Sequence, residues 1–190
     1  MLDDLNHSGT LGLLYGDAEL TRLALYGVTQ MAVDGHIVWV LDGANSFDAY
    51  WVARLARYWG SAPETVLSRI RLSRAFTCYQ MATLVTQKLN ASLDSSIPAA
   101  IVCLGLLATF YDDDVPMMDA VRLLNQIITH LSRYARDGHS ILITARPPRA
   151  ELRERAALFD LLKSSVDLAR LVSVESPTSS LAIQPSLFAL

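Results

Sequence analysis

The chain has 190 residues, 16 Lys and Arg against 19 Asp and Glu, and a formal net charge of −3. This length fits one domain with a substantial core, and the acidic balance argues against strong autonomous nucleic-acid binding. Hydrophobic residues make up 52% of the chain and charged residues 18%. We therefore expect part of the apolar surface to be covered by a protein partner or by a second copy.

The sequence predicts neither a membrane span nor an export signal. The longest uncharged run, residues 95–111, contains Pro98 and is shorter than the roughly 18 apolar residues of a spanning helix. The first ten residues, MLDDLNHSGT, are acidic, whereas a secretory signal begins with a basic stretch. Cys78 and Cys103 have no pairing or metal-ligand spacing, which favours a reduced, cytoplasmic protein.

Residues 11–35 predict a strand, a tight turn at Gly16 and a long amphipathic helix. Apolar residues recur at spacings of three and four after the turn, and Asp17 is expected to cap the helix. In phosphate-binding α/β proteins such a turn is a glycine-rich loop that ends in Gly-Lys-Ser/Thr. Here the turn reads GDAELTR, with one glycine, no lysine, and the carboxylates of Asp17 and Glu19.

The next segments predict a second strand and an aromatic-rich helix. Residues 36–41 form an apolar run typical of a strand buried on both faces. A helix is expected over residues 47–59, with Ser46 as its cap. We interpret its aromatic residues as core and rim packing, with a partner surface as the alternative. These residues are Phe47, Tyr50, Trp51, Tyr58 and Trp59.

The middle of the chain continues this alternation. A short helix over 63–68 and a strand over 69–73 come first, and a helix then runs from about residue 78 to 90. Thr77 and Gln80 form a capping box at its start. A position near a helix start can lower the pKa of a thiol such as Cys78, but no histidine is near it in the sequence and we predict no nucleophile–base pair. A fourth strand is expected over 99–107.

The last third of the chain begins with three consecutive carboxylates, Asp112, Asp113 and Asp114. We interpret them as a solvated loop in which Asp114 caps a helix over 116–136, with a divalent-cation site as the alternative. A strand over 140–144 and a charged helix over 150–163 follow. Residues 166–174 and 181–184 then predict an antiparallel hairpin.

This alternation predicts an α/β fold for residues 1–190, with a mostly parallel central sheet and helices on both faces. The order of motifs resembles the ATPase core of the RecA/RadA recombinase superfamily. YGDAELTRLAL lies at the Walker A position, and IVWVLDGANSFDAYWVARLA and RIRLSRAFTCYQMATLV are similar to the next two strand–helix units. AAIVCLGLLATFY lies at the Walker B position, and ILITARPP at the sensor strand. The resemblance implies a RecA-like three-layer sandwich.

The catalytic residues that the resemblance implies are absent from this sequence. Gly16 alone is retained in the degenerate P-loop region 11–35, and the family's catalytic glutamate aligns with Ala44. The Walker B aspartate aligns with Leu104, or with Cys103 one register away, and the sensor glutamine aligns with Arg146 or its neighbour. We therefore expect no catalytic residue, no cofactor and no metal.

Four arginines fall where the family places its second DNA-binding loop: Arg146, Arg149, Arg153 and Arg155. They would form a patch that contacts phosphates or a partner, but Glu151 and Glu154 interleave with them. We favour an ordinary solvated helix face.

Together these features suggest a non-catalytic RecA-like pseudo-ATPase that acts as a protein-interaction or regulatory subunit linked to recombination or repair. Its partner would be another protein or a second copy. The alternatives are an atypical nucleotide-binding ATPase and a DNA-binding accessory module.

Overall fold

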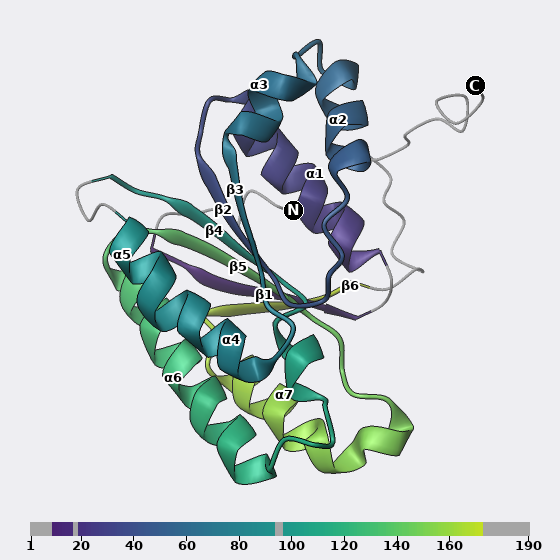
Figure 1. The fold of residues 1–190 in the computed structure, drawn as a ribbon, viewed down its shortest axis with the longest axis vertical. Coiled ribbons are helices and arrows are strands. Elements are labelled where there is room, and N and C mark those ends of the chain that lie inside the picture. Colours follow the sequence, from purple (N-terminus) through teal and green to yellow (C-terminus); the bar gives the residue numbers. More distant parts are fainter. Residues whose placement is uncertain (1–8, 17–18, 94–96, 173–190) are drawn as a thin grey trace.

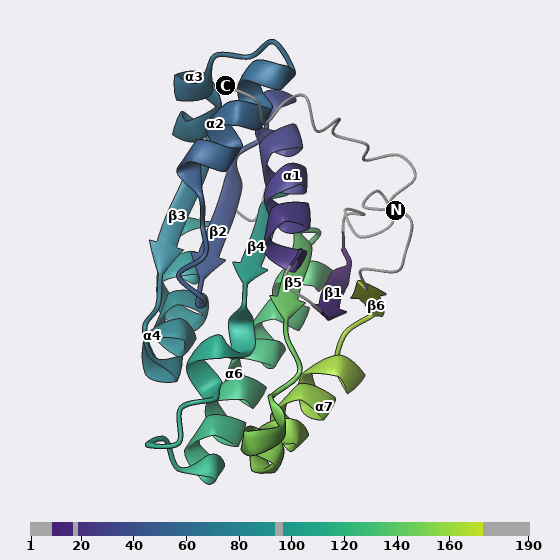
Figure 2. The same cartoon turned by 90° about the vertical axis from the view of Figure 1, so that its right-hand side faces the viewer.

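The computed structural model describes residues 9–16, 19–93 and 97–172. Six strands in these residues form one sheet in the order β3-β2-β4-β5-β1-β6, and every described pair of neighbours is parallel (Figure 2). The strands are β1 (Leu11–Gly16), β2 (Val38–Asp42), β3 (Ile70–Arg74), β4 (Ala100–Leu104), β5 (Ser140–Ala145) and β6 (Leu168–Val172). The predicted α/β fold with a parallel sheet is confirmed.

Helices cover both faces of the sheet and form a three-layer arrangement (Figure 1). One face carries α1 (Leu20–Val33), α2 (Ala49–Tyr58) and α3 (Pro63–Ser68). The other carries α4 (Cys78–Thr83), α5 (Asn90–Ser92), α6 (Met117–Arg136) and α7 (Ala156–Ser164). A π-helical segment, η2 (Leu84–Leu89), joins α4 to α5, and two 3₁₀ helices are η3 (Leu106–Phe110) and η4 (Ala150–Arg155). None of the described helices has the length and apolar character needed to cross a membrane.

The core is divided by the sheet into two layers. Because successive side chains of a strand point to opposite faces, neighbours in β4 belong to different layers. Val102 and Leu104 pack with α1 and α2, whereas Ile101 and Cys103 pack with α6. All four are at most 4% exposed. Burial of both faces explains why the sequence shows continuous apolar runs here rather than strict alternation.

The capping box at Thr77 is confirmed. Its hydroxyl accepts the backbone N–H of Gln80 at 3.2 Å, and the Gln80 side chain accepts the backbone N–H of Phe76 at 2.8 Å. The helix then widens into η2, where the Tyr134 hydroxyl donates to the Val85 carbonyl at 2.8 Å. This bond from α6 gives the Val85 carbonyl a partner inside the widened turn.

Several local predictions were wrong. Asp48, not Ser46, caps α2, because its carboxylate accepts the Trp51 N–H at 3.0 Å. Asp114 does not cap α6, which begins after Pro116 without a side-chain cap. The expected helix over 150–163 is split into η4 and α7. The fourth strand ends at Leu104 because Gly105 adopts a φ of +59° and η3 begins there.

Two predictions fall partly outside the described residues. Asp17, the expected cap of α1, lies outside them, and the side chain of Glu19 at the N-cap position makes no capping hydrogen bond. Residues 168–172 of the expected hairpin form β6, which pairs in parallel with β1. The segment 181–184 lies outside the described residues, so the antiparallel hairpin stays a prediction.

Candidate functional site

A hollow of about 490 Å³ opens at the carboxyl edge of the sheet. The helix after β1 covers one face of the sheet and the helices after β5 cover the other (Figure 1), so the chain leaves these neighbouring strands in opposite directions. Ligands of open α/β sheets bind at such points. The lining residues are Leu20, Thr21, Ala44, Ser46, Gly105, Ala108, Tyr111, Thr144, Ala145, Arg146, Pro147, Arg149 and Leu152.

The hollow is lined by residues that follow four strands, and the resemblance assigns a catalytic position to each of these segments. Thr21 follows β1, Ala44 follows β2, Gly105 follows β4 and Arg146 follows β5. The structure thus brings together the four segments that the resemblance assigns to the Walker A, catalytic glutamate, Walker B and sensor positions. Among the described lining residues there is no Asp, Glu or Lys. The polar side chains that line it are the hydroxyls of Thr, Ser and Tyr and two guanidinium groups.

Ala44 and Gly105 lie in direct contact. A Cβ atom added to Gly105 would collide with the Cβ of Ala44. The Gly105 N–H also donates to the Thr144 hydroxyl at 2.8 Å, and the Gly43 N–H donates to the Leu104 carbonyl at 2.9 Å. The loops after β2 and β4 and the end of strand β5 are therefore tied together on the floor of the hollow.

Leu104 and Cys103 both point away from the hollow. Leu104 packs in the core beneath α1 and α2, Cys103 packs in the opposite core layer, and both are fully buried. Burial raises the pKa of the Cys103 thiol to about 12. Neither register of the Walker B alignment therefore places a charged group at this edge.

Asp42 has a structural role in the turn after β2. Its side chain is fully buried and accepts the backbone N–H groups of Ser46 at 3.0 Å and Phe47 at 2.9 Å. Arg74 at the end of β3 approaches the same carboxylate at 3.6 Å. With these partners Asp42 fixes the loop after β2, and it is not among the residues that line the hollow.

Gly16 is required by packing rather than by a phosphate loop. It is the last residue of β1, has a φ of +131°, and pairs with Val172 of β6. A Cβ atom here would collide with the Val172 carbonyl. Only glycine allows this approach between two backbones.

The four arginines occupy three different environments. Arg146 and Arg149 line the hollow and are exposed, and the Tyr111 hydroxyl donates to the Arg146 carbonyl at 2.8 Å. Arg153 is exposed but does not line the hollow. Arg155 is only 6% exposed and donates to the carbonyls of Asp112 at 2.8 Å and Val115 at 2.6 Å. Arg155 therefore holds the loop before α6 and does not lie on the solvated helix face that we favoured for it.

The reactive alternatives find little support in the described part of the chain. Asp112 accepts the N–H of Asp114 at 3.0 Å, as in an ordinary Asx turn. No group of three or more His, Cys, Asp or Glu side chains in these residues could hold a metal ion. Burial raises the pKa of the Cys78 thiol, contrary to the lowering expected from its place at a helix start.

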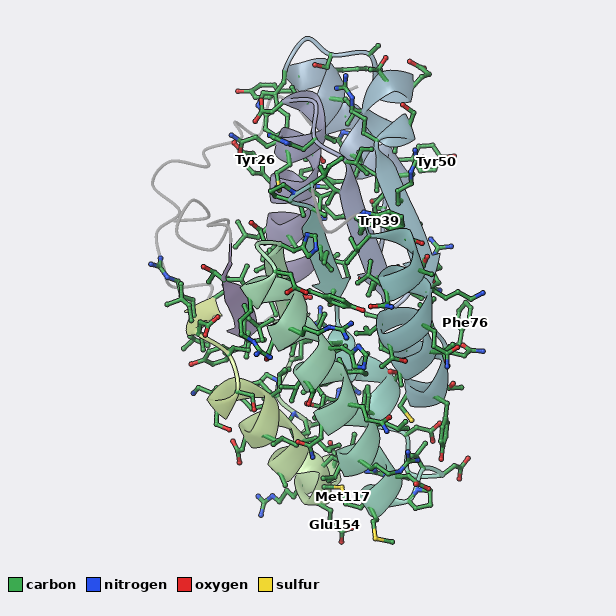
Figure 3. The ribbon with its side chains drawn as sticks, turned by 90° about the vertical axis from the view of Figure 1, so that its left-hand side faces the viewer. Tyr26, Trp39, Tyr50, Phe76, Met117 and Glu154 are labelled. Carbon is green, nitrogen blue, oxygen red and sulfur yellow. The ribbon has the colours of Figure 1, made fainter. Side chains whose placement is uncertain are left out.

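A second feature, the outer edge of β3, was missed by sequence reasoning. Within the described residues β3 pairs with β2 alone, and Arg71, Leu72 and Arg74 are exposed. Phe76, just beyond the strand, is 68% exposed, and Tyr50 of α2 is 86% exposed. Figure 3 shows both rings projecting from the same side of the molecule.

The exposure of Tyr50 corrects part of the packing interpretation. Phe47, Trp51 and Trp59 are partly buried as expected, whereas Tyr50 and Tyr58 are exposed. An amphipathic pattern identifies the buried side of a helix but does not show which exposed aromatic side chains lie beside an open strand.

Comparison with known proteins gives no family for this chain. No protein-family model matches it, and no curated protein matches it significantly.

Proposed function

We propose that this chain is a non-catalytic RecA-like protein that binds another protein, or a second copy of itself, through the outer edge of β3. The observation that carries the non-catalytic part is the make-up of the hollow at the carboxyl edge. Its described lining has no carboxylate and no lysine, and Ala44 packs against Gly105 where the resemblance places a catalytic carboxylate.

Phosphoryl transfer depends on groups that neutralise phosphate charge, hold Mg²⁺ and position the attacking water. Arg146 and Arg149 are the cations that line this hollow, and both lie after β5 rather than in the turn before α1. The hydroxyl of Thr144 accepts the Gly105 N–H, so its oxygen holds the backbone of the floor. The arrangement supports a retained scaffold whose catalytic groups have been lost.

The β3 edge supports the interaction part. The open edge of a strand exposes backbone N–H and C=O groups with which another extended segment can pair. Arg71 and Arg74 flank exposed Leu72 on this strand, so the complementary segment would carry acidic residues beside an apolar one. Phe76 and Tyr50 would add apolar contact beside the new strand. The resemblance to recombinases suggests that such a subunit acts in recombination or repair.

Sedimentation velocity over a range of protein concentrations tests this surface. Replacement of Phe76 by serine is expected to weaken self-association or partner capture at least tenfold, because an exposed aromatic anchor is lost. Met118→Ser is the matched control, since Met118 is 85% exposed on α6, outside this surface. A chain that is monomeric at every concentration and captures no partner, or equal effects of both variants, would contradict the proposal.

A DNA-binding accessory role is the second candidate, and one observation favours it. Arg146, Arg149 and Arg153 are all exposed in the segment after β5. If they contact phosphates, binding of single-stranded DNA should weaken as salt rises, and Arg149→Ala with Arg153→Ala should reduce that salt dependence. No retardation of DNA in a gel at low salt would remove this candidate.

A further inference from the structure

A second hollow lies between α1 and α2, distinct from the one at the carboxyl edge. It has a volume of about 250 Å³ and is lined by Tyr26, Gln30, Val33, Asp34 and Trp59. The first four residues come from α1 and its C-cap, and Trp59 is the C-cap of α2. Figure 3 shows Tyr26 in the helical layer that contains α1.

Two aromatic rings form a corner in this hollow. The ring centroids of Tyr26 and Trp59 are 4.9 Å apart and their planes meet at 79°. Both side chains are partly buried, which holds the rings in place. The faces of aromatic rings are electron-rich and attract cations, and tryptophan is the strongest of them. A group held between two nearly perpendicular rings contacts both.

The charge of the hollow also favours a cation. Asp34 is exposed, and the ion pairs among the described residues, which join Arg22 to Glu19, Arg74 to Asp42 and Arg122 to Asp119, do not involve the Asp34 carboxylate.

Asp34 lies at the C-cap of α1, and the last turn of this helix has no basic residue. A helix C-terminus carries partial negative charge. The guanidinium of Arg69 donates to the Ala32 carbonyl at 2.8 Å, and Arg69 is not among the residues that line the hollow.

We propose that this hollow binds an alkylammonium group, held by cation–π contact with Tyr26 and Trp59 and by the carboxylate of Asp34. Its volume lies below the roughly 300–1,000 Å³ of pockets for drug-sized ligands, so it suits a small head group rather than a nucleotide. A trimethylated lysine side chain and free choline share this head group. The site does not depend on the β3 edge or on the loss of ATPase residues.

The test compares a cation with its neutral isostere. Choline and 3,3-dimethylbutanol have nearly the same shape but differ in charge, so each is titrated while the indole N–H of Trp59 is followed by NMR. Choline is expected to bind at least about fivefold more tightly, as cation–π contacts at a partly exposed site would require. N-acetyl-trimethyllysine amide is the second cationic probe. The tighter of the two cations identifies the source of the head group.

Substitutions test whether Asp34 and Trp59 bind the cation. Asp34→Asn and Trp59→Leu should each weaken binding of the cation about fivefold or more, with the Trp59 variant followed through the ligand signals. Asp137→Asn, at the C-cap of α6, and Tyr58→Leu, beside the hollow in sequence but outside its lining, are the matched controls. Asp34→Asn is expected to fold normally because Asp34 is exposed. Equal binding of the isostere, no binding of either cation, or equal losses in the control variants would overturn the proposal.

Discussion

At the scale of single residues, two positions that lie in motif-like turns have structural roles instead of catalytic ones. Gly16 lies in a turn that suggests a phosphate loop, yet the carbonyl of Val172, its register partner on β6, explains why a glycine is needed. Asp42 lies where a catalytic turn is expected, yet its buried carboxylate holds the backbone of Ser46 and Phe47. In both cases the packing around the residue, rather than its place in a motif, decides its role.

Gly16→Ala gives a direct test at this scale. The new Cβ would collide with the Val172 carbonyl in a backbone conformation that L-residues avoid, so we expect a loss of about 3 kcal/mol in the free energy of unfolding. Gly60 is the matched control, because its φ is +70° and no atom lies within 4 Å of an added Cβ. Gly60→Ala should cost about 1 kcal/mol. Urea denaturation measures both, and equal losses would contradict the steric explanation.

At the scale of elements, helix α6 carries a histidine whose ionisation is coupled to folding. Partial burial of His130, and to a lesser extent the charge of Arg133, lowers the pKa of its imidazole below 6.5. The unfolded chain therefore binds more protons between that lowered pKa and 6.5, and stability should fall as pH decreases through this window.

NMR titration of the His130 ring protons should give an inflection below pH 6.5. Arg133→Gln should move that inflection upward, because one nearby positive charge is removed. His130→Gln should flatten the dependence of the urea midpoint on pH in the same window. An inflection at or above 6.5 would contradict this lowering of the His130 pKa.

Helices and strands were predicted well where a local sequence pattern determines where they lie. Apolar runs identified the strands that became β1, β2, β4 and β5, and the pair Thr77 and Gln80 identified the start of α4. Prediction failed where a neighbour decides the outcome. The end of β4 depends on the unusual φ of Gly105, which packs against Ala44 from another loop. The burial of Arg155 depends on carbonyls about forty residues earlier in the chain.

At the scale of the whole molecule, the candidate site could be predicted only in part. The sequence showed that Ala44 and Leu104 lack the carboxylates of the resembled family, but only the sheet order shows that the loops after β1, β2, β4 and β5 share one hollow. The open edge of β3 and the aromatic corner of Tyr26 and Trp59 were not predicted. Both depend on which elements are neighbours in space, and no local pattern encodes that.

The central claim is that this scaffold has lost nucleotide chemistry. Titration calorimetry of the chain with Mg-ATP tests it most directly, because the hollow at the carboxyl edge is the one site where the resemblance places the nucleotide. We predict no saturable heat up to millimolar Mg-ATP, since the described lining offers no lysine for the phosphates and no carboxylate for the metal shell. Saturable binding in the micromolar range that is abolished by Arg146→Ala would contradict the claim.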